Sequence, residues 1–201
     1  MGRLGHGADL PPGRAAGQVG GCQVYEGIFF GGFGGQGIIL AGKIICLAAM
    51  GEGKHVSHIP SYGAEMRGGT ANCSVVVSDE EIASPLVPQP SVCIVMNKPS
   101  LLKFESMVRP GGLLIWNESL IDLAPERSDI ETFAVRANDI AEAAGSYKSA
   151  NMVMLGVLLK KRPGIASMAA VLGVLNDAVS ARHRELNETN RKALAGGYER
   201  A

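Results

Sequence analysis

Three glycines are the first residues in the sequence whose type and spacing could do chemistry. Gly32, Gly34 and Gly37 have the G-x-G-x-x-G spacing of dinucleotide-binding folds, within the run "IFFGGFGGQGIILAGKIICLAAM". Glycine lets the backbone approach a ligand closely, and the free N–H groups at the start of the following helix attract anions. The loop from Gly34 to Gly37, with Gly35 and Gln36 between them, therefore suits a phosphate, a partner surface or a plain tight turn.

A nicotinamide or flavin site needs a further residue. In such sites an acidic residue about 20 residues after the glycine motif, at the end of the second strand, binds the ribose hydroxyl. Glu52 has roughly that spacing but precedes the second strand, whose end "HIPSY" contains no acid. Gln36 would also place a long polar side chain where the loop faces a ligand. The pattern favours a phosphate-facing or partner-facing loop over a dinucleotide site.

A second loop, "PSYGAEMRGGTANC", places Tyr62, Glu65, Met66 and Arg67 between small residues. Arg67, next to Gly68, could make a two-pronged contact with a carboxylate or phosphate, oriented by Glu65. The alternative is a Glu–Arg pair on a solvated loop, and the spacing alone favours it.

Other arrangements of reactive residues point away from a complete catalytic site. His55 and His58 lie three apart on a strand and do not converge as metal ligands, and the sequence has no G-x-S-x-G, H-E-x-x-H or P-loop lysine. The four cysteines form no C-x-x-C pair, which argues against a zinc or iron–sulfur site in this chain. Asn97 and Asn151 could serve as helix caps.

Composition narrows the class of protein. The chain has 201 residues, 46% of them hydrophobic, with 19 Lys and Arg against 19 Asp and Glu. A balanced charge does not favour binding to nucleic acid or to an anionic membrane. The sequence also lacks an uncharged apolar run of about 18 residues, so no membrane span is predicted. Unpaired cysteines in apolar contexts favour a reducing cytoplasm.

The elements that must position these residues follow from hydrophobic periodicity. Strands are expected at 25–32, 54–60, 70–79, 91–97, 113–118 and 130–137. Helices are expected at 37–51, 98–112 with Ser100 as N-cap, 138–145 with Asn138 as cap, 151–161 and 164–179. The polar C-terminal segment predicts a helix broken at Gly196–Gly197, and 61–69 reads as a loop.

Strands alternating with helices predict an α/β fold with a mixed, mostly parallel sheet. The link between 54–59 and 70–78 is too short for a crossover helix, so that pair should be antiparallel or an irregular crossing. Residues 1–23 are rich in Gly, Ala, Pro and Arg and read as a flexible extension. Residues 24–201 then form one domain.

Residues 25–199 resemble the gamma subunit, or gamma domain, of the 2-oxoacid:ferredoxin oxidoreductases. The resemblance is carried by "GFGGQG" paired with "SYGAEMRGG", and continues through "NKPSLLKF" and "GSYKSANMVMLG". It implies a three-layer α/β subunit of a complex that decarboxylates a 2-oxoacid, passes electrons to ferredoxin and forms an acyl-coenzyme A.

The resemblance also implies a division of labour. Thiamine diphosphate, Mg²⁺ and [4Fe–4S] clusters belong to alpha, beta and delta subunits, so this chain binds no cofactor alone and is inactive in isolation. The "YGAEMRGGTANCSV" and "NMVMLG" segments look more like the 2-oxoglutarate branch than the pyruvate branch. The two loops are expected side by side, facing the alpha subunit and coenzyme A, with Arg67 as an anion clamp. The implied site residues are Gly34, Gly35, Gln36, Gly37, Ser61, Tyr62, Glu65, Arg67 and Gly68.

Overall fold

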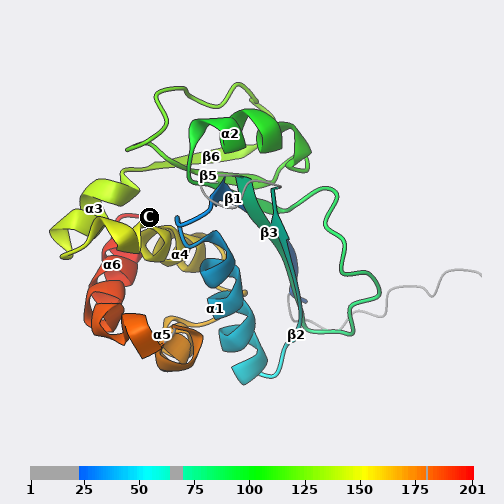
Figure 1. Cartoon of the computed structure of the whole chain (residues 1–201). Coiled ribbons are helices and arrows are strands. Elements are labelled where there is room, and N and C mark those ends of the chain that lie inside the picture. The colour runs from blue at the N-terminus through cyan, green and yellow to red at the C-terminus, as the bar shows by residue number, and fades with distance from the viewer. Residues whose placement is uncertain (1–22, 64–69, 180) are drawn as a thin grey trace, which may run out of the picture.

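A six-stranded sheet forms the centre of the computed structural model, which describes residues 23–63, 70–179 and 181–201. The strand order is β2-β3-β1-β4-β5-β6 (Figure 1). The strands are β1 (Tyr25–Phe33), β2 (His55–Tyr62), β3 (Thr70–Ser78), β4 (Val92–Val95), β5 (Leu113–Asn117) and β6 (Glu131–Val135). The expected extension 1–23 lies, but for its last residue, outside the described residues.

Six α-helices and three short 3₁₀ helices accompany the sheet within the described residues. They are α1 (Ile38–Gly51), α2 (Lys98–Phe104), α3 (Ala137–Ala143), α4 (Ala150–Lys161), α5 (Met168–Ala178), α6 (Asn187–Glu199), η1 (Glu105–Met107), η2 (Tyr147–Ser149) and η3 (Ala181–Leu186). No helix in the described part of the chain is long and apolar enough to cross a membrane.

Strand direction confirms the mixed sheet. β3 runs antiparallel to both of its neighbours, β1 and β2, whereas β1, β4, β5 and β6 pair in parallel. The predicted antiparallel pair is therefore correct, and β3 lies between the two strands that α1 connects.

Helices cover both faces of the sheet. Figure 1 shows α2 on one side and α1 with α3–α6 on the other. Neighbouring residues of a strand point to opposite faces, so Phe30 joins the larger core with α1 and α4, and Phe29 joins the smaller core, its ring 4.6 Å from that of Phe104. Burial on both faces explains why β1, β4 and β5 read as continuous apolar runs.

Strand β2 continues two residues past its predicted end at Pro60. β2 is an edge strand. Gly63 N–H donates to the Thr70 carbonyl, so the odd-numbered residues of β2 are the ones that bond β3. The backbone groups of its even-numbered residues therefore face away from β3. Pro60 therefore loses no ladder hydrogen bond and remains in the strand. Ser61 and Tyr62, expected in a loop, are its last residues.

Three predictions about helix caps were wrong, and one was right. The helix expected over 98–112 ends at Phe104, and its N-cap is Asn97, whose Oδ1 accepts from Ser100 N–H at 2.9 Å. Asn138 lies inside α3, and Asn117 accepts from Ala137 N–H in its place. Asn151 lies inside α4 and caps nothing of its own helix.

The predicted break at Gly196–Gly197 is also wrong, because α6 runs through both residues. A Cβ on Gly197 would lie 2.0 Å from the Val153 carbonyl oxygen, and one on Gly156 would lie 2.1 Å from that of Leu194. The glycines therefore let the backbones of α4 and α6 approach closely.

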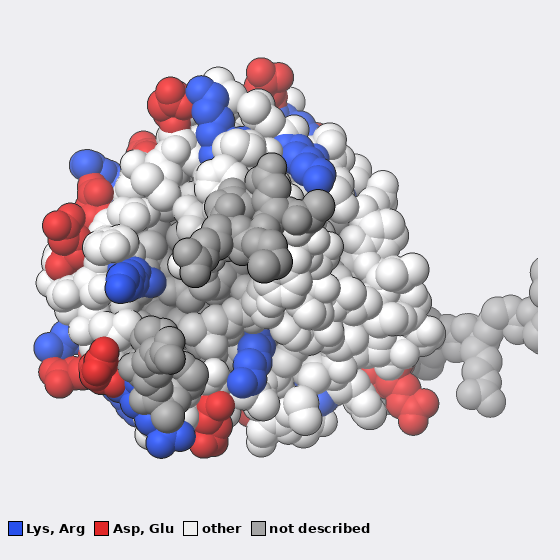
Figure 2. All heavy atoms as spheres, in the orientation of Figure 1, with Lys and Arg blue, Asp and Glu red and all other residues white. Residues whose placement is uncertain are grey.

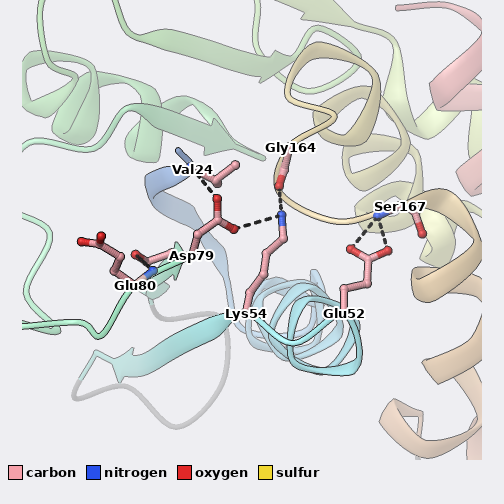
Figure 3. Close-up of polar contacts among 8 residues, drawn as sticks. Val24, Glu52, Lys54, Asp79, Glu80, Gly164 and Ser167 are labelled. Carbon is pink, nitrogen blue, oxygen red and sulfur yellow. Dashed lines mark hydrogen bonds and ion pairs between the residues drawn. The ribbon is translucent and has the colours of Figure 1, made fainter. Parts of the chain in front are cut away.

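Polar contacts connect segments that are distant in the sequence near the amino-terminal end of β1 (Figure 3). The Lys54 ammonium donates to the Gly164 carbonyl and lies 3.9 Å from Asp79, whose other oxygen accepts from Val24 N–H at 2.8 Å. Glu52, at the end of α1, accepts from Ser167 N–H at 3.1 Å.

Candidate functional site

The first candidate site lies outside the carboxyl ends of β1 and β4. These neighbouring strands are parallel, and their connections leave in opposite directions: α1 leads to β2 on one face, and α2 leads to β5 on the other. Such a switch point opens a crevice that ligands commonly occupy in α/β folds. We call the space between the glycine loop 34–37 and the η2 turn the switch-point crevice.

The glycine loop has the backbone that its sequence predicts. Gly35 and Gly37 have φ of 95° and 74°, and Gly37 is the N-cap of α1. A Cβ on Gly37 would lie 2.3 Å from Asn151 Nδ2, and one on Gly32 would lie 2.7 Å from Ile38 Cδ1. Two glycines of the motif are thus required by contacts within the chain itself.

Gln36 has a role that the sequence did not reveal. Its Oε1 accepts from Phe33 N–H at 2.7 Å and from Asn97 Nδ2 at 3.0 Å, and its Nε2 donates to the Met96 carbonyl at 3.4 Å. The amide therefore ties the glycine loop to the end of β4, rather than pointing freely at a ligand.

A pocket of about 460 Å³ lies beside the loop, at the N-terminus of α1. Its polar side carries Lys148, Asn151 and Asn190, and its apolar side carries aliphatic residues of α1, α4 and the α5–η3 region. The lining residues are Gly35, Gly37, Leu40, Tyr147, Lys148, Asn151, Met152, Ala178, Val179, Leu186 and Asn190.

A smaller pocket of about 220 Å³ adjoins the ends of β4 and β5 and shares Gly35, Tyr147 and Lys148 with the first. The η2 turn thus lies between the two pockets, and Tyr147 is 63% exposed on it. Among the residues that line either pocket, Lys148 is the sole charged one. Its ammonium and the free N–H groups of α1 make this crevice attractive to an anion.

Buried amides set the polar wall of the larger pocket. Asn151 is 4% exposed and donates from Nδ2 to the Gly37 carbonyl at 3.1 Å, which joins α4 to the first residue of the α1 turn. Asn190 accepts from Ser149 Oγ at 2.7 Å. Both side chains are held in place by the chain, as a preformed binding site requires.

The strands from which the two predicted loops leave, β1 and β2, end at the same rim of the sheet. Phe33 of β1 pairs with Thr70, and Tyr62 of β2 pairs with Ala71, so both strands end at the same edge with β3 between them. Tyr62 is 69% exposed there. Glu65, Arg67 and Gly68 lie outside the described residues, so the anion clamp stays a prediction.

The dinucleotide interpretation gains no support from the position of Glu52. Glu52 follows the last residue of α1, and its carboxylate accepts from Ser167 N–H (Figure 3). It therefore lies far from the glycine loop, at the other end of the 14-residue helix α1.

His58 and the three described cysteines, Cys46, Cys73 and Cys93, pack within the chain. Among the described residues, no group of three or more His, Cys, Asp and Glu could hold a metal ion. Cys73 Sγ and His58 Nε2 lie 2.6 and 3.0 Å from the position of a Cβ on Gly42. Burial lowers the pKa of His58 and raises the pKa of Cys46 and of Cys73 to about 12, so these thiols stay protonated and unreactive at neutral pH.

Charged side chains are unevenly distributed over the face in Figure 2. They gather over the helical side, whereas the area over β2 and β3 is almost free of them. Residues 55–63 and 70–78 contain no Lys, Arg, Asp or Glu. A surface depleted of charge is typical of the centre of a protein–protein interface.

Sequence reasoning missed Tyr147, Lys148 and Asn190 as candidate site residues. Each comes from a segment more than 100 residues beyond the glycine loop, and the packing of α4 against α1 and of α6 against α4 brings them there. The exposed Tyr-Lys pair after Gly145 is a weak signal in the sequence, because turns commonly carry such residues.

Comparison with known proteins gives consistent matches. The family described as pyruvate ferredoxin/flavodoxin oxidoreductase matches residues 27–200. The 2-oxoglutarate synthase subunit KorC of Methanothermobacter marburgensis is 36% identical over 164 residues, covering 78% of this chain and 87% of that protein. The ketoisovalerate oxidoreductase subunit VorA of the same organism is 41% identical over 128 residues, covering 64% of this chain.

The match to VorA spans only 27% of that subunit's length. Among solved structures, the gamma subunit of a keto/oxoacid ferredoxin oxidoreductase from Geobacter sulfurreducens has a TM-score of 0.74 and 30% identity. The match covers 88% of this chain and 98% of that one.

Proposed function

This chain belongs to the pyruvate ferredoxin/flavodoxin oxidoreductase family, and from that membership we propose that it is the gamma subunit of a heteromeric 2-oxoacid:ferredoxin oxidoreductase. The observation that carries the proposal is the length of the match to the Geobacter gamma subunit, nearly all of which this chain covers. The uncharged area over β2 and β3 supports a role inside a complex, since interface centres are depleted of charge.

The favoured substrate is 2-oxoglutarate. The complex would convert 2-oxoglutarate and coenzyme A to succinyl-coenzyme A and carbon dioxide, with two electrons passing to ferredoxin, and it would run in either direction. KorC supports this choice, because its similarity extends along 87% of its length. A branched-chain 2-oxoacid is the second candidate, because VorA has the higher identity over a shorter stretch. Pyruvate is a third.

Partner subunits would hold the redox and thiamine chemistry. We assign thiamine diphosphate and Mg²⁺ to the alpha and beta subunits, and the [4Fe–4S] clusters to a beta or delta subunit. This chain would then act by positioning, as a non-catalytic subunit on the coenzyme A side.

The switch-point crevice supports the coenzyme A side of this proposal. The N-terminus of α1 and Lys148 suit phosphate groups, and the aliphatic wall with Asn151 suits a chain that carries both methylene and amide groups. A pocket of about 460 Å³ would take part of the coenzyme, with the rest against a neighbouring subunit. Arg67, as the sequence predicts, would add a clamp for a phosphate of the same coenzyme.

Purification of the native complex through a tag on this chain tests the proposal. The complex should reduce ferredoxin with 2-oxoglutarate and coenzyme A, at a higher kcat/KM than with pyruvate or 3-methyl-2-oxobutanoate. A higher kcat/KM with either of the others would move the assignment to that substrate. Recovery of the chain without any oxidoreductase subunit would reject the gamma-subunit role.

A stand-alone dinucleotide-binding protein is the rival from another class. Titration of the full-length chain with NAD or FAD in a calorimeter should give no heat of binding, because β2, at whose end the ribose-binding acid is expected, contains no carboxylate. Tight binding of either nucleotide would favour the rival.

A further inference from the structure

The two edges of the sheet differ in a way that the proposed function does not use. β2 forms one edge and β6 the other, at opposite ends of the sheet (Figure 1). An edge strand offers unpaired backbone groups to any other extended chain, unless proline, charge or a covering segment prevents it. Pro60 in β2 removes one outward N–H from that edge.

The free edge of β6 has no such block. Glu131 N–H donates to the Gly112 carbonyl, and the Val135 carbonyl accepts from Glu118 N–H, so the odd-numbered residues of β6 face β5. The N–H and C=O groups of Thr132 and Ala134 therefore point away from the sheet. Both residues are exposed and uncharged, and neither is proline.

A pocket of about 370 Å³ lies at the carboxyl end of this edge. Its apolar lining comes from β6, α3 and α4 and consists of Phe133, Ala134, Val135, Ile140, Ala143 and Val157. A strand added beside β6 would direct alternate side chains to this face of the sheet. The pocket is large enough for one aromatic or large aliphatic side chain.

Most charged side chains around β6 are paired within the chain, and Glu118 lines the pocket together with Asp139, Arg136 and Arg200. Arg136 pairs with Asp139 at 2.6 Å, and Lys161 and Arg162 share Glu131 at 3.7 and 3.6 Å. Arg200, on the pocket rim, donates to the Gly196 carbonyl at 3.1 Å and pairs with no carboxylate in the described part of the chain. It is therefore available to an acidic side chain that follows the apolar one.

We propose that β6 accepts an extended segment of a partner polypeptide as a seventh strand. An aromatic or large aliphatic side chain of this segment fills the pocket, and an acidic side chain contacts Arg200. Such strand addition draws affinity from main-chain hydrogen bonds and specificity from the pocket. The inference rests on the proposed role in a heteromeric complex, and names where and how a partner chain attaches.

Amide hydrogen exchange tests the inference directly. It compares the native complex, purified through this chain, with the full-length chain produced alone. The amides of Thr132 and Ala134 should exchange at least about tenfold more slowly in the complex, because they become hydrogen-bonded only there. The amides of Phe133 and Val135, already bonded to β5, are the internal reference.

The outcomes separate the two proposals. A purified complex in which Thr132 and Ala134 exchange as fast as in the chain alone overturns only the strand addition. If the Thr132 and Ala134 amides are protected in the chain alone, and the protection grows with protein concentration, the edge pairs with a second copy of this chain. That result also overturns the proposed strand addition. A chain that recovers no partner subunit overturns both proposals.

Variants at the edge give an independent test. Ala134→Pro removes the outward N–H without breaking the β5 ladder, and should lower recovery of partner subunits at least about fivefold. Ala134→Val also changes the side chain at this position but keeps that N–H, so it should recover partner subunits better than Ala134→Pro. Arg200→Glu should also lower recovery, with rescue by Arg200→Lys. Equal recovery for Ala134→Pro and Ala134→Val, at equal thermal stability of the chain, would contradict the proposal.

Discussion

Gly37 lies where the glycine loop, α1 and α4 meet. Its φ of 74° favours glycine, and its Cα faces the Asn151 amide. Any side chain at this position would therefore destabilise the fold in two ways, through backbone strain and through a steric clash with Asn151. Nearby glycines share only one of these features or neither, so the costs can be measured apart.

A series of Gly→Ala variants should rank in a fixed order. Gly37→Ala should lower the free energy of unfolding by about 2–4 kcal/mol, and Gly35→Ala, with positive φ but open space, by about 1 kcal/mol. Gly51→Ala, in α1 with open space and ordinary φ, should be neutral or stabilising. Urea unfolding of the full-length chain measures all three. Equal effects at Gly35 and Gly37 would show that the Asn151 contact is unimportant.

Lys148 is the charged residue of the switch-point crevice. If the crevice holds phosphates of coenzyme A, Lys148→Ala should raise the KM for coenzyme A by about tenfold, with a smaller effect on kcat, because the lost contact is made in the ground state as well. Steady-state assays of the native complex measure it. Lys192→Ala, which removes an exposed lysine paired with Glu188, is the matched control and should change neither constant.

His58 gives a pH dependence of stability whose sign follows from its environment. Burial lowers its pKa below the ordinary value of 6.5, so the unfolded chain binds this proton more readily than the folded one. The contribution of His58 is complete above pH 6.5 and is lost as the pH falls through the folded-state pKa. The neighbouring thiols of Cys46 and Cys73, with pKa of about 12, do not titrate there.

Unfolding of wild type and His58→Gln should therefore differ in slope. Between about pH 7.5 and pH 5.5 the wild type should lose more stability than the variant, and His55→Gln, at an exposed position, should behave as wild type. Parallel curves for wild type and His58→Gln would contradict this account.

At the scale of elements, the backbones of α4 and α6 approach closely at Gly156 and Gly197. Gly197→Ala should lower the free energy of unfolding by about 2–4 kcal/mol, because the new methyl group would meet the Val153 carbonyl. Gly173→Ala in α5, with open space around it, is the matched control and should be neutral or stabilising. Thermal unfolding of the two variants measures the difference. Similar melting temperatures would mean that α6 shifts freely to accommodate the methyl group.

Periodicity predicted most elements because both faces of the sheet and one face of each helix are apolar. It failed where a tertiary contact overrides a local preference. Pro60 is tolerated because β2 is an edge strand, and Gly196–Gly197 stay helical because α4 packs against them. Asn97 takes the cap that Ser100 was expected to provide, since Pro99 stands at the start of that helix.

The candidate site was predicted only in part. The glycine loop and its shared rim with Tyr62 follow from the two motifs and the direction of β1 and β2. Lys148 and Asn190 did not follow, because their approach depends on how three helices pack over the sheet. Gln36 was misread as ligand-facing, since a local sequence gives no sign that Asn97 would bond it.

At the scale of the whole molecule, Lys54 links segments that are far apart in the chain. Its side chain is 16% exposed, donates to Gly164 and approaches Asp79, which in turn binds Val24 (Figure 3). Lys54→Met should lower the free energy of unfolding by about 1 kcal/mol, because the Gly164 carbonyl loses its donor and Asp79 loses the nearby ammonium, while both groups remain open to water. Denaturant unfolding measures it.

Lys98→Met is the control for Lys54. Its ion pair with Asp122 is short, at 2.7 Å, but lies in solvent, so its removal should leave stability almost unchanged. A loss at Lys98 as large as that at Lys54 would show that charge alone, rather than the tie between segments, sets the effect.

The insertion of β3 between β1 and β2 has a consequence for the order of assembly. Both lateral neighbours of β1, the strands β3 and β4, follow α1 and β2 in the chain and are synthesised after them. The nascent β1 therefore stays without a hydrogen-bonding partner until Thr70 and the residues after it emerge. The β2–β3 hairpin, whose contacts are local, is ready first, and its arrival closes one side of β1 before β4 closes the other.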